Sequence, residues 1–351
     1  MHILIFQFFS IILLAIYLSC ANYQERIKKR IFFLLSFSSM WYVHSMVDAN
    51  TFEDLPTYKE VFESICITPW NKVPTHWATI NMELGYLYFN KIIGTIFPSF
   101  TFFLWIFSFW MLFFYFRTIK YHSPYVTLSI LLLLLIPYNQ SLFVIRQHMA
   151  VAIYFATIPL ILKRKLFKFL LVALATFFLH RSSIMFIPVY FLFGFDGKRL
   201  IVALAAAVLL VLMEWGLIIS LSASLFDYEW FTTEAEGLTN LTTFVQILLF
   251  YLIYVFSLKK AIFESNINKL VFCVLTLALF VNTISVGINI GRMGLYYNVF
   301  SILSIPISLK YIKSKYLRVV IGWTIVLLLY IQMSYGSNFQ YVERMRLVSL
   351  F

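Results

Sequence analysis

The stretch FPSFTFFLWIFSFWMLFFYF, residues 97–116, contains no charged side chain and decides the fold class. About 20 apolar residues in a row cross a bilayer as one helix, because a helix satisfies its own backbone hydrogen bonds within the hydrocarbon. The whole chain has the same character, since 62% of its 351 residues are hydrophobic and 12% are charged. Soluble domains carry about 25% charged residues. The sequence therefore predicts an all-α polytopic integral membrane protein.

Cutting the chain at its polar interruptions predicts about twelve transmembrane helices. No linker or soluble domain separates them, so we expect one membrane domain over residues 1–351. The first span is followed by QERIKKR, residues 24–30, which favours a retained anchor over a cleaved signal peptide. The expected spans are residues 2–21, 31–47, 96–116, 124–137, 143–162, 166–179, 183–195, 200–221, 243–258, 270–287, 295–311 and 318–335.

The basic residues are unevenly divided between alternate loops. Most of the 27 lysines and arginines lie in one set of loops, and the positive-inside rule assigns this set to the cytoplasm. We therefore expect both termini outside. The same division accounts for the net charge of +12 without a nucleic-acid partner. The cytoplasmic set comprises residues 26–30, 117–120, 163–168, 198–199, 259–269 and 310–318.

Several of the few basic residues of the outer face lie at the mouths of predicted spans. Arg146 begins the fifth span, His180 ends the sixth and Arg292 begins the eleventh. A guanidinium at membrane depth costs roughly 2.5 to 3.5 kcal/mol on insertion scales, so it needs a reason to be there. One alternative is that each arginine only extends to the lipid headgroups. The other, which the polar neighbours favour, is that they converge on a polyanion. These neighbours are Gln147, His148, Arg181, Ser182 and Tyr296.

The longest polar stretch of the outer face, residues 48–95, lies between the second and third spans. Long loops in compact folds are usually functional, and Asp54 and Tyr58 are candidates for binding. Glu83 differs from the other acids because it opens the apolar-rich stretch MELGYLYFNKIIGTIF. We expect a re-entrant or interfacial helix there, and burial would raise the pKa of Glu83 towards that of a general base.

Short pieces of the chain share their order and spacing with a known family. The pieces are EDLPTYKEVFE with Asp54 and Tyr58, MELGYLYF with Glu83, Gly85 and Tyr86, RQHMAVAIYF with Arg146 and Ala150, LHRSSIMFIP with His180, Ser182 and Ser183, and GRMGLYY with Arg292 and Tyr296. Together they resemble the EpsG and Wzy-type polysaccharide polymerases, and the resemblance covers about residues 30–310.

This resemblance implies a GT-C-like membrane glycosyltransferase architecture in the bacterial cytoplasmic membrane, with an active site facing the periplasm or exterior. Such enzymes join undecaprenyl-pyrophosphate-linked oligosaccharide repeat units into O-antigen, exopolysaccharide or capsule. A chain-length regulator and a flippase are implied as partners, besides the lipid bilayer.

The reaction assigns roles to the outer-face residues. Arg146 and Arg292 would hold the diphosphate, because a guanidinium binds phosphate oxygens bidentately and stays charged. Glu83 or His180 would take the proton of the acceptor hydroxyl, and we favour Glu83. The remaining expected substrate contacts are Asp54, Tyr58, Tyr86, Gln147, Arg181, Ser182 and Tyr296.

Neither a metal nor a cofactor is expected. The sequence contains no Asp-x-Asp pair of the kind that binds a nucleotide and metal, and the lipid diphosphate already activates the donor. The three cysteines, Cys20, Cys66 and Cys273, lack metal or redox spacing.

Three other functions stay open. A lipid-linked oligosaccharide flippase or other transporter would place its cations in a central cavity between two similar halves. A membrane acyltransferase would use a buried histidine, for which His180 is a candidate. A purely structural membrane subunit is the third alternative.

Overall fold

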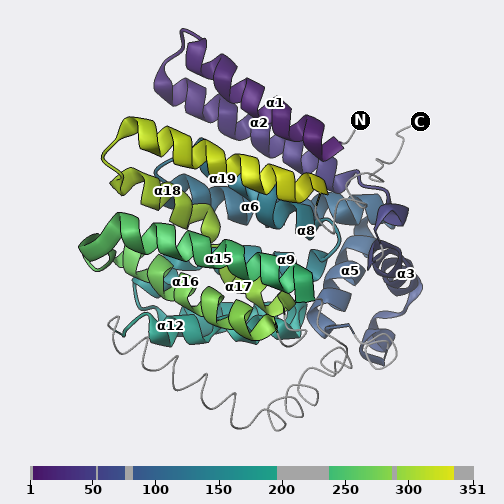
Figure 1. Cartoon of the computed structure of the whole chain (residues 1–351). Coiled ribbons are helices and arrows are strands. Elements are labelled where there is room, and N and C mark those ends of the chain that lie inside the picture. The colour runs from purple at the N-terminus through teal and green to yellow at the C-terminus, as the bar shows by residue number, and fades with distance from the viewer. Residues whose placement is uncertain (1–2, 53, 76–81, 196–236, 287–290, 336–351) are drawn as a thin grey trace. The chain divides into compact units, whose positions relative to one another are not determined.

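The computed structural model describes residues 3–52, 54–75, 82–195, 237–286 and 291–335, and the regular elements in these ranges are helices (Figure 1). Within these ranges, six helices are long and apolar enough to cross a membrane. The prediction of an all-helical, polytopic membrane protein is therefore confirmed, whereas the number twelve stays a prediction. The six candidate spans are Ile3–Cys20, Phe100–His122, Ile145–Leu162, Asn240–Ile262, Asn266–Ser285 and Lys315–Ser334.

The other expected spans correspond to shorter or more polar helices. Most of residues 31–47 fall in α2 (Glu25–Ser45), whose first turns are basic. Apolar helices of intermediate length cover Val126–Ser141, Leu166–Leu179 and Arg181–Leu192. The span expected at residues 200–221 lies outside the described residues.

The chain divides into two compact units. The first comprises Met1–Ala156, Phe178–His180 and Gly322–Phe351, and the second comprises Thr157–Phe177 and Arg181–Ile321.

Aromatic rings hold the helices of the first unit together. Helix α2 packs along α6 (Phe100–His122), where the rings of Trp41 and Trp105 lie 4.4 Å apart and the Trp41 indole donates to the Trp105 carbonyl. Phe103 and Phe107 of α6 are buried, whereas Trp110 and Phe113 are exposed. The aromatic density of residues 97–116 therefore serves two purposes: some rings fill the core and others are available to lipid.

A π-helical turn precedes the segment that carries Arg146. Helix α7 (Val126–Leu133) continues into this turn at Leu134–Tyr138, which contains Pro137. Proline cannot donate the regular helix hydrogen bond, which explains the local widening. The short α8 (Asn139–Ser141) follows, and α9 (Ile145–Phe155) then begins with Ile145 and Arg146.

The long outer stretch is largely helical. Its main helices, α3 (Asp54–Ile67) and α5 (Leu84–Ile96), pack against each other. The Lys91 ammonium donates to the Cys66 carbonyl at 2.9 Å, which satisfies an orphan carbonyl at the end of α3. Two helices joined in this way give Glu83, the N-cap residue of α5, a fixed support.

The second unit is built on α15 (Gly237–Leu258), which packs against α16 (Asn266–Ser285) and α18 (Ser301–Tyr311). Polar contacts, one of them fully buried, join these helices. The Tyr254 hydroxyl donates to the Asn268 carbonyl at 2.8 Å, and the Asn268 amide donates to the Tyr311 hydroxyl at 2.9 Å. Such bonds are typical of helix association within membranes.

Candidate active site

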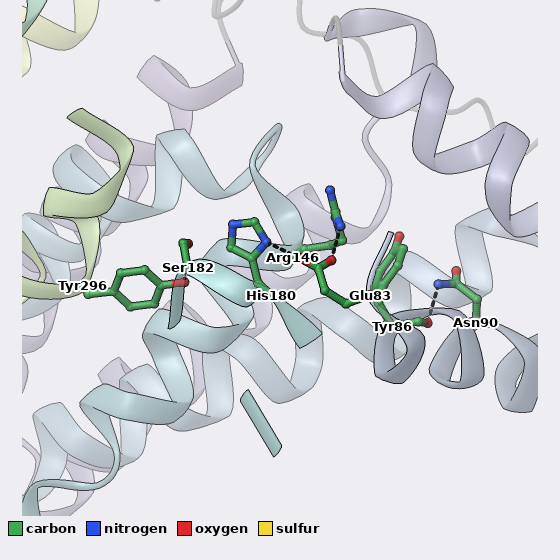
Figure 2. A network of polar contacts seen from close by, with 7 residues as sticks. All are labelled: Glu83, Tyr86, Asn90, Arg146, His180, Ser182 and Tyr296. Atoms are coloured by element: carbon green, nitrogen blue, oxygen red, sulfur yellow. Dashed lines mark hydrogen bonds and ion pairs between the residues drawn. The ribbon is translucent and has the colours of Figure 1, made fainter. Parts of the chain in front are cut away.

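Glu83 joins two residues that are distant in the sequence. Its Oε1 accepts a hydrogen bond from His180 Nδ1 at 3.0 Å, and its Oε2 accepts a hydrogen bond from Arg146 Nη1 (Figure 2). Glu83 is 7% exposed and His180 is also 7% exposed. All three residues belong to the first unit. A buried carboxylate here therefore binds one permanent cation and one imidazole.

The backbone explains why Glu83 is available for these contacts. It is the N-cap of α5 in an extended conformation, but its side chain makes no capping hydrogen bond. Arg146 lies in the first turn of α9, and His180 directly follows α11 (Leu166–Leu179). The three side chains thus come from helix ends. The backbone is not regularly helical there, so a side chain can point away from the helix face.

The contact with Glu83 fixes the tautomer of His180. An ionised carboxylate only accepts hydrogen bonds, and its pairing with Arg146 keeps it ionised. The ring proton is therefore on Nδ1, and the lone pair of the neutral ring is on Nε2. In hydrolytic triads a carboxylate orients a catalytic histidine in the same way.

Arg146 is held between two tyrosine rings. Its guanidinium carbon lies 5.4 Å from the centre of the Tyr58 ring and 5.5 Å from that of Tyr86, distances at which cation–π attraction operates. The two rings meet edge to face at 6.0 Å. The Arg146 side chain is 14% exposed. These contacts favour a fixed, partly buried position over a side chain that extends to headgroups.

The cluster contains buried polar atoms that make no hydrogen bond with any residue in the described part of the chain. These are Nε of Arg146 and the hydroxyl of Tyr86. Burial also raises the pKa of the Tyr86 hydroxyl above its ordinary value, so the phenol is neutral. Since an unpaired buried donor costs about 1 to 3 kcal/mol, stability alone does not explain this arrangement, which is typical of functional sites.

Two other expected site residues meet in the second unit. Ser182 Oγ and the Tyr296 hydroxyl lie 3.1 Å apart, and both side chains are buried (Figure 2). Arg292 is exposed in the 3₁₀ helix η7 (Gly291–Gly294), which directly precedes α17 (Leu295–Asn298) and therefore Tyr296. This unit accordingly carries Arg292 one turn before Tyr296, whose hydroxyl pairs with Ser182.

Comparison with known proteins identifies the family. The model of the EpsG family matches residues 30–345, which is most of the chain. The chain belongs to the EpsG family. No curated protein and no solved structure gives a significant match. The resemblance seen in the sequence is thus confirmed, and membership indicates a membrane-embedded polysaccharide polymerase with glycosyltransferase-like activity.

The structure of this EpsG-family chain brings several expected site residues together. Glu83, Arg146 and His180 form one cluster in the first unit, with Tyr58 and Tyr86 packed on the arginine. Asp54 begins α3, and Gln147 is buried beside Arg146 on α9. Arg181 begins the 3₁₀ helix η4 (Arg181–Phe186) in the second unit.

Sequence reasoning did not connect two of the expected substrate contacts with Arg146. Tyr58 and Tyr86 both pack on its guanidinium, and their contact with the substrate stays a prediction. The sequence could have indicated that Tyr86 lies near the cluster. Residues three apart at the start of a helix share a face, and Tyr86 lies three positions after Glu83. No comparable signal linked Tyr58 to Arg146 across the intervening sequence.

Proposed function

We propose that the chain is a polymerase that joins undecaprenyl-pyrophosphate-linked oligosaccharide repeat units into a polysaccharide, on the outer face of the bacterial cytoplasmic membrane. Family membership supports the general activity. One observation carries the finer proposal: a single buried carboxylate, Glu83, bonds both Arg146 and His180. This arrangement provides a cation for a polyanionic leaving group and an oriented base for an acceptor hydroxyl.

His180 is the base in this proposal, and Glu83 orients it. The sequence favoured Glu83, but both of its carboxylate oxygens are engaged by donors. Pairing with a guanidinium stabilises the charged carboxylate and makes it a poorer proton acceptor. With its proton on Nδ1, His180 offers the lone pair of Nε2 to the acceptor hydroxyl, and imidazole has a suitable basicity near neutral pH.

The proposed reaction transfers the growing glycan to an incoming repeat unit. The acceptor hydroxyl oxygen attacks the anomeric carbon of the donor, while the bond from that carbon to the diphosphate oxygen breaks. His180 takes the hydroxyl proton, and undecaprenyl pyrophosphate leaves with the electron pair. Arg146 stabilises the charge that develops on the diphosphate, and Arg292 supplies the second cation. The step as written requires no metal or cofactor.

The other expected contacts fit the same proposal. Tyr58 and Tyr86 hold the Arg146 guanidinium in one orientation, which reduces the entropy lost when it binds phosphate. The proposed sugar contacts are Asp54, Gln147, Arg181, Ser182 and Tyr296.

We further propose that α5 lies at the outer boundary of the bilayer. Ile92, Ile96 and Phe97 are exposed, and α6, a candidate span, begins three residues later. An exposed apolar helix face that leads into a span suits the lipid interface. This supports an interfacial helix in the 48–95 loop. The proposal also includes a single membrane domain of about twelve spans with a GT-C-like architecture and both termini external. A chain-length regulator and a flippase are its proposed partners.

The experiment is reconstitution of the full chain in proteoliposomes with a lipid-linked repeat unit. Wild-type protein should extend chains, whereas His180→Ala should bind the lipid-linked substrate but form glycosidic bonds about 1,000-fold more slowly. His122→Ala is the matched control. His122 is the last residue of α6 and lies at a predicted cytoplasmic loop, so this variant should extend chains at the wild-type rate.

Three results would contradict the proposal. Normal extension by His180→Ala would exclude histidine as the base. If wild-type protein instead moved intact lipid-linked units across the bilayer without joining them, it would be a flippase. Transfer of an acyl group would indicate the acyltransferase alternative.

A further inference from the structure

Gly85 occupies a position where a side chain has no room. A Cβ atom built on Gly85 would lie 2.6 Å from the carbonyl oxygen of Phe178, 2.7 Å from its Cβ and 2.9 Å from its carbonyl carbon. Contacts of this kind under 3.0 Å are essentially never found. Two of these three atoms belong to the backbone, so no rotamer change could relieve the clash.

This close approach lies beside the contact between Glu83 and His180. Gly85 follows Glu83 by two residues, and Phe178 precedes His180 by two residues. All four residues belong to the first unit. The start of α5 and the end of α11 therefore touch backbone to backbone at the point where their side chains exchange a hydrogen bond of 3.0 Å.

We propose that Gly85 is a positioning residue of the polymerase: its missing side chain sets the spacing at which Glu83 Oε1 reaches His180 Nδ1. This inference rests on the proposed function, in which His180 acts as the base. Gly85 touches no substrate in this scheme and acts only through the Glu83–His180 pair.

The size of the effect follows from the distances. Ordinary van der Waals contact begins at 3.4 Å, so an alanine at position 85 would push α5 away from Phe178 by several tenths of an ångström. Hydrogen bonds are effectively lost by about 3.6 Å, and catalytic groups tolerate displacements of about 0.5 Å. A shift of this size would therefore stretch the 3.0 Å hydrogen bond between Glu83 and His180 to about the distance at which it is lost.

Gly94 offers a matched control on the same helix. A Cβ atom at Gly94 would strike the Cys66 Sγ and no atom of Phe178. Gly94→Ala therefore disturbs the packing of α3 on α5 and changes helix propensity in the same way, but it spares the contact with Phe178. In a Cys66→Ala background the sulfur is absent, so Gly94→Ala should be tolerated still better. No substitution at position 178 would remove the clash at Gly85 in the same way, because the backbone of residue 178 remains in every variant.

The first test is a double-mutant cycle in the reconstituted polymerase, with Gly85→Ala, Glu83→Gln and their combination. Gly85→Ala should lower kcat about 100-fold with KM little changed. In the Glu83→Gln background the same change should lower the rate by no more than about twofold, because a neutral amide already replaces the charged acceptor that it would displace. Gly94→Ala should stay near the wild-type rate. Full additivity of Gly85→Ala and Glu83→Gln would overturn the inference.

The second test does not depend on activity. In full-length protein labelled with ¹⁵N-histidine, the His180 ring signals are assigned by difference from His180→Ala, since the chain has six histidines. Gly85→Ala and Glu83→Gln should shift the Nδ1 signal in the same direction, and Gly94→Ala should leave it unchanged. An unshifted His180 signal in folded Gly85→Ala would overturn the inference.

Glu83→Asp covers the case in which Gly85→Ala does not fold. It shortens the carboxylate's reach by one methylene without adding an atom, so it should shift the same His180 signal and lower kcat. A wild-type signal and rate in Glu83→Asp would show that the spacing is unimportant. If wild-type protein joins no repeat units, the proposed function fails, whereas the histidine spectra still test the role of Gly85.

Discussion

Two buried histidines of the first unit differ in the groups that bind them. His44, on α2, is 1% exposed, and neutral groups occupy both of its ring nitrogens. Its Nδ1 lies 2.7 Å from Ser108 Oγ, and its Nε2 lies 3.1 Å from Ser141 Oγ. His180 instead shares a hydrogen bond with the carboxylate of Glu83.

This difference shows that the hydrogen-bond partner of a buried histidine, and not its burial, indicates whether the ring can act as a base. Serine hydroxyls can satisfy a neutral imidazole at both nitrogens, but they offer no charge to support a protonated ring. A carboxylate orients the ring and stabilises the imidazolium that forms when the ring takes a proton. We therefore expect His44 to contribute to stability and His180 to contribute to chemistry.

The largest expected effect on activity is that of His180→Ala. Loss of a general base lowers rates by about 100- to 10,000-fold, so chain extension should fall about 1,000-fold while thermal unfolding in detergent changes little. Single-turnover extension of a lipid-linked repeat unit measures the rate. A loss of stability without a loss of rate would reverse the assignment of the two histidines.

Substitution of Arg146 should have the next largest effect on the rate. Arg146→Ala removes the cation that Glu83 and the two tyrosine rings hold, and extension should fall at least about 100-fold. It also removes the permanent cation from a buried ion pair, at a cost of about 3 to 5 kcal/mol in stability. Arg146→Lys separates the two causes, because it keeps the charge but loses the planar fork. Equal rates for the lysine variant and wild type would show that charge alone is required.

His44→Phe should show the opposite pattern to His180→Ala. Ser108 loses its partner in a buried position, which costs about 1 to 3 kcal/mol of stability. Ser141 keeps a hydrogen bond, because its hydroxyl also donates to the Tyr138 carbonyl. The unfolding temperature should fall, and the extension rate per folded molecule should stay near that of wild type. A rate as low as that of His180→Ala would place His44 in the chemistry.

The smallest expected loss of rate among the proposed site residues concerns the second unit. Tyr296→Phe removes a hydroxyl that lies 3.1 Å from Ser182 Oγ, and a neutral hydrogen bond contributes about 1 kcal/mol. Extension should fall about fivefold or less. Tyr297→Phe is the neighbouring control, because the Tyr297 hydroxyl donates to the Met185 carbonyl instead. A larger loss in Tyr297→Phe than in Tyr296→Phe would remove the reason for placing Tyr296 at the site.

The sequence predicted the helical membrane fold well because length and hydropathy determine spans locally. It predicted the span boundaries less well where a helix changes form. The span expected at residues 124–137 continues through the π-helical turn at Pro137 to Ser141. A proline suggests an end to a helix, but neighbouring groups can satisfy the freed backbone in a membrane protein.

The site was predictable as a set of residues but not as a set of contacts. Apolar context singled out Glu83, and position at span mouths singled out Arg146 and His180. Glu83 lies 63 residues from Arg146 and 97 from His180, and no local pattern pairs residues over such separations. The sequence favours Glu83 as the base from its apolar context and the family resemblance, and that choice stays a prediction. The structure adds that donors engage both of its carboxylate oxygens.

The contact between Cys66 and Gly94 gives the molecule its own chemical reporter. Burial raises the pKa of the Cys66 thiol, so at neutral pH little of it is the reactive thiolate. In the closed packing of α3 on α5, the sulfur lies against Gly94. Cys66 is partly exposed, and separation of the two helices would expose its sulfur further to a bulky maleimide. The labelling rate of Cys66 would thus respond to opening of the packing between α3 and the helix that supports Glu83.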